Sequence, residues 1–157
     1  MIDPFFPNKS PELMGNLLRI RGIAEGLPNR AKQELYSVLT SIHPDLCETK
    51  FSSESGFTLA FQNGQVLAFP SQLPAVILEH ITCGYIEWLT RKYTLPGFVM
   101  VEPGDCVVDC GSFIGGFALG HVGVASEIHT FEPELSNYQC TVRNLQNFFN
   151  VCCENKG

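Results

Sequence analysis

Segment 107–116 constrains the fold of this chain more than any other part of it. It reads Val-Val-Asp-Cys-Gly-Ser-Phe-Ile-Gly-Gly, a short apolar run that ends on an acid and is followed by closely spaced glycines. Residues 106–109 predict a strand, the glycines allow a tight turn, and a helix of about ten residues is predicted from Gly115. A second strand is predicted at 127–131 and is followed by another acid, Glu132. This order of elements predicts a parallel strand-helix-strand unit and an α/β fold.

The last part of the chain continues the same alternation. A helix is predicted from Pro133, with Leu135, Tyr138, Val142 and Leu145 on its apolar face. A third strand is predicted to begin at residues 151–153. Helices and strands thus alternate to the end of the chain, as in a Rossmann-like sheet.

The N-terminal half predicts helices and one hairpin. Residues 1–27 have mixed polarity and predict an irregular arm with one short helix at 11–21. Residues 28–42 predict an amphipathic helix. Its apolar face would consist of Leu35, Val38, Leu39 and Ile42.

Two apolar runs, 57–61 and 65–69, flank an Asn-Gly pair, which predicts a β-hairpin. Pro74 opens a helical stretch that Gly84 is placed to cap, and residues 85–93 predict another helix. We therefore divide the chain into an N-terminal α+β extension, residues 1–97, and the first part of a Rossmann-like domain, residues 98–157.

Composition excludes several classes of partner. The net charge is -6, and the ten Lys and Arg form no basic run, which argues against nucleic acid as a partner. The N-terminus lacks a secretory signal, and no apolar run is long enough to span a membrane, so we expect a cytoplasmic protein without a membrane partner.

The seven cysteines are odd in number and irregularly spaced, which predicts reduced, structural thiols. Neither Cys106 and Cys110 nor the adjacent Cys152 and Cys153 have the spacing and histidine partners of a zinc site, so no metal site is predicted. His129 is expected to be a hydrogen-bonded structural histidine in a buried strand.

The glycine turn and the two acids predict the kind of ligand. Backbone N–H groups in a turn before a helix can hold a carboxylate or a phosphate. Glu132, at the end of the neighbouring strand, lies where a carboxylate accepts hydrogen bonds from both hydroxyls of an adenosine ribose. The glycine spacing departs from the G-x-G-x-x-G of dinucleotide-binding proteins, which favours S-adenosyl-L-methionine over NAD. Asp109 could then steer the ammonium group of the methionine part.

Residues 102–115 resemble motif I of S-adenosylmethionine-dependent methyltransferases of the FkbM family. The resemblance extends over residues 57–151 and includes further matching segments at residues 84–87, 131–133, 137–138 and 144–145. It implies S-adenosyl-L-methionine as the cofactor, with Asp109, Gly111 and Gly115 at its methionine end and Glu132 at its ribose. The complete set of expected cofactor contacts is Asp109, Cys110, Gly111, Ser112, Phe113, Ile114, Gly115, Glu132 and Pro133.

Two further residues follow from the resemblance. Phe113 stands where the family usually has Asn, and its ring could instead face the sulfonium group, an attraction of roughly 0.5–2 kcal/mol. Glu87 is a candidate contact to cofactor or substrate, while no catalytic base is assigned. The reaction implied is O-methylation of a hydroxyl on a small molecule or glycan.

Such methyltransferases have a seven-stranded sheet, whereas this chain ends near the third strand, so we expect it to be part of a longer domain. The uncovered sheet edge would favour homo-oligomers. Two alternatives remain: an NAD-dependent oxidoreductase fragment, or a non-catalytic Rossmann-like module that serves in association.

Overall fold

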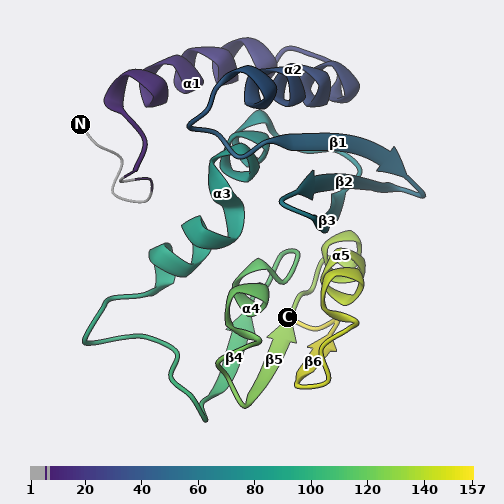
Figure 1. Cartoon of the computed structure of the whole chain (residues 1–157). Coiled ribbons are helices and arrows are strands. Elements are labelled where there is room, and N and C mark those ends of the chain that lie inside the picture. The colour runs from purple at the N-terminus through teal and green to yellow at the C-terminus, as the bar shows by residue number, and fades with distance from the viewer. Residues whose placement is uncertain (1–5, 7) are drawn as a thin grey trace.

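The computed structural model describes residue 6 and residues 8–157, so part of the predicted arm, residues 1–5 and 7, lies outside the described residues. The described chain has an α/β fold with two three-stranded sheets, antiparallel β1-β2-β3 and parallel β4-β5-β6 (Figure 1). The helices are α1 (Pro11–Ala24), α2 (Asn29–Ile42), α3 (Ala75–Tyr93), α4 (Gly116–His121) and α5 (Leu135–Leu145). The strands are β1 (Thr49–Glu54), β2 (Phe57–Gln62), β3 (Gln65–Pro70), β4 (Cys106–Cys110), β5 (Glu127–Phe131) and β6 (Val151–Glu154).

The parallel sheet confirms the predicted order of strand, helix and strand. β4 pairs with β5 in parallel, and β5 pairs with β6 in parallel. One face of this sheet packs on α4 and α5 through a small core of Ala118, Ala125, Ile128 and Leu145. α4 has only six residues, shorter than the predicted helix. It ends at His121, whose ring nitrogen Nδ1 bonds to the carbonyl oxygen of Phe117 at 2.8 Å.

The predicted hairpin is confirmed in the antiparallel sheet. Asn63 and Gly64 turn the chain with φ values of 51° and 77°, as a tight two-residue hairpin requires. The sequence did not predict β1, which pairs with β2 along its full length. β1 is an edge strand with a mostly exposed, polar sequence, so it lacks the apolar alternation that marks a strand.

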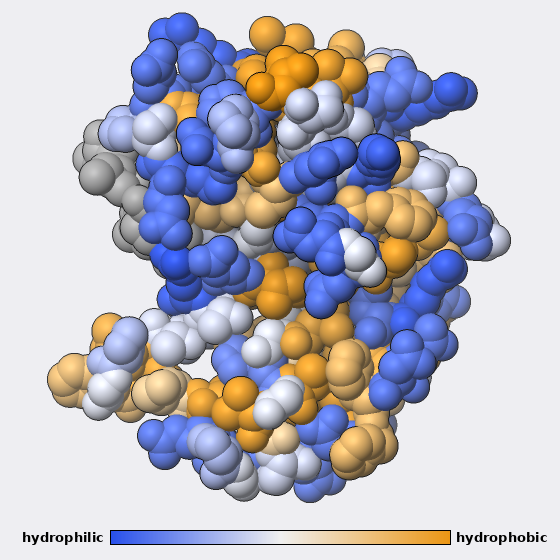
Figure 2. All heavy atoms as spheres, in the orientation of Figure 1, coloured by the Kyte–Doolittle hydropathy of each residue, from blue (hydrophilic) through white to orange (hydrophobic). Residues whose placement is uncertain are grey.

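The buried face of α2 differs from the predicted one. Val38 and Ile42 are 59% and 73% exposed, whereas Gln33, Tyr36 and Thr40 are buried. Polar partners in the sheet explain the difference, because Gln33 Nε2 donates to Thr58 Oγ1 at 3.1 Å and Thr40 Oγ1 donates to the carbonyl of Thr49 at 3.2 Å. Figure 2 shows an apolar patch over the α1 and α2 end of the molecule. The exposed apolar side chains of these helices are Leu18, Ile23, Val38 and Ile42.

α1 confirms the predicted helix and extends it to Ala24, with Ser10 as a side-chain N-cap. α5 confirms the helix after Pro133, but Leu135 and Val142 of its predicted apolar face are exposed. Its buried residues are Cys140, Thr141 and Leu145.

α3 connects the two sheets, and Gly84 breaks it into two helical segments with φ 101° and ψ 77°, as its predicted capping position indicated. Its second segment packs closely on α4: a Cβ on Gly116 would lie 2.6 Å from Leu89 Cδ1, and one on Gly120 would lie 2.7 Å from Thr90 Oγ1. Within the described residues, no helix combines the length and apolar character needed to cross a membrane.

Candidate functional site

A cavity of about 450 Å³ lies between α3 and the turn that follows β4. One part of its wall is the chain from Val108 to Phe113, and the other consists of apolar and aromatic side chains from α3 and α4. The residues from these helices are Ile77, Tyr85, Trp88, Leu89, Tyr93 and Phe117. The structure therefore brings five residues of the predicted set together: Asp109, Cys110, Gly111, Ser112 and Phe113.

The turn is built from residues in the left-handed region. Gly111, Phe113 and Gly115 have φ values of 76°, 55° and 73°. A Cβ on Gly115 would lie 2.7 Å from Leu145 Cδ1, so this glycine is also required by packing. A Cβ on Gly111 would meet nothing within 4 Å, which leaves open space beside the turn. Phe113 adopts a backbone conformation that is uncommon for a residue with a bulky side chain.

The amides of the turn are used inside the protein. The backbone N–H groups of Gly111 and Ser112 donate to the carbonyl oxygen of Phe131 at 2.8 and 3.1 Å. The N–H of Phe113 donates to Glu132 Oε2 at 2.8 Å. The expectation that the turn offers its amides to an anionic ligand is therefore wrong for these three groups.

Glu132 joins the turn to the start of α5. Its side chain is buried, and Oε1 accepts hydrogen bonds from the N–H of Glu134 at 3.0 Å and from Asn137 Nδ2 at 3.4 Å. Like Ile114, Gly115 and Pro133, it does not line the cavity. Ile114 is fully buried in the core, and Pro133 is exposed. These four predicted contacts thus lie outside the cavity wall.

Asp109 is the unusual ionisable group of the site. Its Oδ2 atom is buried and has no hydrogen-bond partner among the described residues. Burial, and secondly the Glu132 carboxylate, raise the pKa of Asp109 to about 6, while His121 acts in the opposite direction. The pKa of Tyr85, in the same cavity wall, is also raised, by burial and by the Asp109 charge. A cationic or hydrogen-bond-donating ligand would satisfy Asp109 and lower its pKa.

The sequence did not predict the aromatic wall as a unit. Tyr85 and Trp88 have helical spacing, which more often marks core residues, and the rings lie 5.9 Å apart. Tyr93 meets Phe117 edge to face at 5.6 Å. Lys92 Nζ lies 5.0 Å from the ring centres of both Trp88 and Tyr93, so these rings already receive a cation.

Glu87 does not join this site. It lines a separate cavity of about 60 Å³ together with Cys47, Cys83 and Gly84. Its Oε1 forms an ion pair with Arg91 Nη2 at 2.6 Å. The structure thus gives Glu87 a neighbouring partner on α3 and no place in the wall beside Asp109.

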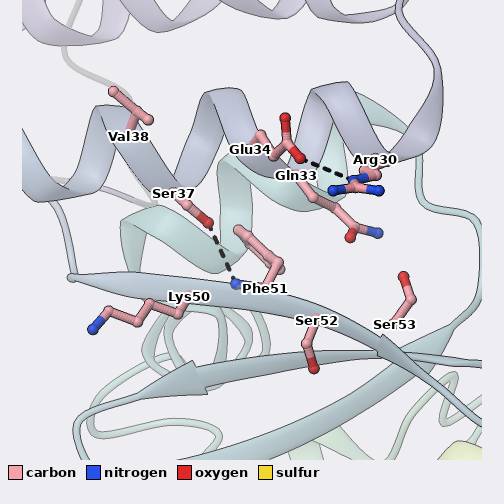
Figure 3. A pocket seen from close by; sticks show the side chains of 9 residues that line it. All are labelled: Arg30, Gln33, Glu34, Ser37, Val38, Lys50, Phe51, Ser52 and Ser53. Atoms are coloured by element: carbon pink, nitrogen blue, oxygen red, sulfur yellow. Dashed lines mark hydrogen bonds and ion pairs between the residues drawn. The ribbon is translucent and has the colours of Figure 1, made fainter.

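A larger hollow of about 630 Å³ lies between α2 and β1 (Figure 3). Its polar side chains mostly bond to near neighbours, as in the pair of Arg30 and Glu34 at 3.0 Å and the N–H of Phe51 donating to Ser37 Oγ at 3.3 Å. No side chain in this lining has a buried polar atom without a partner. The cavity beside Asp109 is the better candidate for that reason.

No family model matches this chain, and no curated protein matches it significantly. Among solved structures, Trm5b from Pyrococcus abyssi matches with 12% identity and a TM-score of 0.39, over 82% of this chain and 44% of that one. TYW2 from P. horikoshii, in complex with MeSAdo, matches with 15% identity and a TM-score of 0.43, over 94% of this chain and 50% of that one. The chain thus spans about half the length of these structures. Both likenesses are distant, with sequence identities below 25% and TM-scores below 0.5.

Proposed function

We propose that this chain binds S-adenosyl-L-methionine in the cavity beside Asp109 and forms the cofactor-binding part of a methyltransferase that resembles the FkbM family. The observation that carries the proposal is the buried Asp109 Oδ2 atom, which no described residue bonds, at the end of β4 in the wall of a ligand-sized cavity. A carboxylate kept without a hydrogen bond costs stability, which is typical of groups retained for a ligand.

The chemistry of the wall suits a ligand with two cationic centres. The ammonium group of the cofactor would donate to Asp109, which pairs the buried charge. The sulfonium group would lie against aromatic rings, among which Phe113 and Tyr85 line the cavity. The cavity therefore offers both a carboxylate and ring faces to one molecule.

The amides of the turn argue against the NAD alternative. A dinucleotide needs free backbone N–H groups to hold its pyrophosphate. Those of Gly111, Ser112 and Phe113 donate to Phe131 and Glu132 instead. A ligand that meets this site with cationic groups is favoured over one that meets it with phosphates.

In the proposed reaction the cofactor supplies an activated methyl group, and the acceptor is a hydroxyl on a small molecule or glycan. The residues of this chain would position the methionine part through Asp109 and exclude water with the aromatic wall. Proximity would supply much of the rate, and a base would take the hydroxyl proton. No residue of this chain is assigned as that base.

The test is calorimetric titration of the chain with S-adenosylhomocysteine, with NAD in parallel. We expect saturable binding of S-adenosylhomocysteine alone, lost in Asp109→Asn and retained in Asp45→Asn, a matched change at an exposed aspartate. Absence of binding to a folded wild-type chain would overturn the proposal. So would equal binding by Asp109→Asn and the wild type.

The alternative of a non-catalytic association module has one observation in its favour. Both Glu132 oxygens accept hydrogen bonds from the protein itself, so this acid has a structural function without any ligand. Under that alternative the chain would form oligomers through its uncovered sheet, and neither ligand would bind. Sedimentation velocity over a range of concentrations would detect such oligomers.

A further inference from the structure

The parallel sheet presents one face that α4 and α5 do not cover. Side chains alternate along a strand, so Val107 and Asp109 on β4 lie on the helix-covered face and Cys106 and Val108 lie on the other. Cys106 and Val108 are both exposed. The Asp109 side chain and this open face therefore lie on opposite sides of the same strand.

Three side chains of different ligand type meet on the open face. Cys106 pairs in register with Glu127 of the neighbouring strand, and His129 follows Glu127 two positions later on the same side. One ligand atom from each residue lies within 4.8 Å of the other two. His129 Nε2 and Glu127 Oε1 are 3.1 Å apart.

These separations are close to those of a metal site. Bonds of roughly 2.0–2.3 Å in tetrahedral geometry place zinc ligands about 3.3–3.8 Å from one another. The thiol need move only about 1 Å beyond its present position, which a small side-chain rotation supplies. All three side chains reach solvent, so an ion has a path to them.

We propose that Cys106, Glu127 and His129 form a zinc-binding site. A thiolate and an imidazole select Zn²⁺ over Mg²⁺ and Ca²⁺, which prefer oxygen ligands alone. Three protein ligands leave a fourth position for water.

The zinc site is independent of the proposed cofactor. Zinc bound here would link β4 to β5 near the amino end of the sheet, away from the turn after the carboxyl end of β4. Cysteine spacing along the sequence did not predict it, because the ligands come from neighbouring strands and only the strand register brings them together.

The test is titration of chelator-stripped protein with Zn²⁺ against a chromogenic chelator. We expect one ion per chain, with affinity lower by roughly 100-fold or more in Cys106→Ser and in His129→Asn, since even loss of an indirect partner of a ligand typically costs 10–100-fold. Cys110→Ser is the matched control, because Cys110 is exposed on the same face of β4 but lies outside the trio. It should bind as the wild type does.

Titration with Co²⁺ gives a second readout that identifies the ligand atom. A bound thiolate produces a sulfur-to-metal charge-transfer band, which should be present in the wild type and in Cys110→Ser and absent in Cys106→Ser. Because the three residues are at the surface, circular dichroism should show that the variants remain folded. Failure of the wild type to bind Zn²⁺, or equal binding by the wild type, Cys106→Ser and His129→Asn, would overturn the assignment.

Discussion

Asp109 makes the folded chain less stable when it is charged. The carboxyl group has a pKa of 3.8 in the absence of its environment and about 6 in the structure. The folded state therefore binds more protons than the unfolded state between these values, and stability falls as the pH rises through this window. Above this pH window the charged Asp109 carboxylate destabilises the folded state fully, and below it the protonated carboxyl group causes no such destabilisation.

Asp109→Asn should therefore change stability in a pH-dependent way. The quantity to compare is the free energy of unfolding of Asp109→Asn minus that of the wild type. This difference should be about 1–3 kcal/mol larger at pH 8 than at pH 4. Urea unfolding at both pH values measures this difference. Asp45→Asn, at an exposed position, should show none. A pH-independent effect of Asp109→Asn would contradict the raised pKa.

The affinity for a ligand that contacts Asp109 should depend on pH in the opposite direction to the folding stability. A cationic group binds the charged carboxylate, so the affinity for S-adenosylhomocysteine should fall as the pH drops below about 6. Binding near pH 6 should also release protons, because the ligand lowers the pKa of Asp109. Titrations in buffers of different ionisation enthalpy measure this release. Unchanged affinity from pH 8 to pH 5 would exclude Asp109 as the contact.

Glu132→Ala separates a structural function of this acid from contact with a ribose. The change removes the acceptor for the N–H groups of Phe113 and Glu134 and for Asn137, so we expect the free energy of unfolding to fall by about 2–4 kcal/mol and ligand binding to be lost. Thermal unfolding and calorimetry measure the two effects. Loss of binding at wild-type stability would instead indicate that Glu132 acts only through direct contact with the ligand. Wild-type affinity would contradict a contact between Glu132 and the ribose. The matched control, Glu48→Ala, changes an exposed glutamate.

At the scale of single elements, the sequence predicted those helices, strands and turns that depend on residues close to one another in the chain. The strands at 106–109 and 127–131, the Asn-Gly hairpin and the break at Gly84 all depend on residues close in sequence, and the structure confirms them. β1 depends on pairing with β2, and the buried face of α2 depends on hydroxyl and carbonyl partners in the sheet. The aromatic wall of the cavity depends on packing of α3 against α4. Contacts between residues far apart in the chain produce no periodic spacing of apolar residues, so the sequence could not predict them.

The close contact of α3 with α4 depends on glycine. Gly116→Ala would place a Cβ 2.6 Å from Leu89 Cδ1 and Tyr85 Cε1, so α4 must move or the side chains must change rotamer. We expect the free energy of unfolding to fall by about 1–3 kcal/mol. Gly123→Ala, where nothing lies within 4 Å, should be close to neutral and is the matched control. Chemical denaturation measures both, and equal stability of the two variants would contradict the close packing.

At the scale of the whole molecule, the Asn144 side chain helps to connect the two sheets. Asn144 on α5 accepts a hydrogen bond from the N–H of Ala68 at 2.8 Å and donates to the carbonyl oxygen of Ala68 at 2.9 Å. Its Nδ2 also donates to the carbonyl oxygen of Ile114 at 3.0 Å. The amide thus satisfies the backbone of edge strand β3 as a further strand would, and it fixes the turn region against the same strand.

Asn144→Ala should therefore weaken the connection between the antiparallel and parallel sheets. It leaves one N–H group and two carbonyl groups without their partner, so we expect a loss of about 2–4 kcal/mol in the free energy of unfolding. Asn147→Ala, at an exposed position shortly after α5, is the matched control and should change stability little. Hydrogen exchange locates the effect: the Ala68 amide should lose protection in Asn144→Ala, while the amides between β4 and β5 keep theirs. Uniform loss of protection over both sheets would mean that they unfold as one unit, and unchanged protection of Ala68 would mean that this bond does not hold the sheets together.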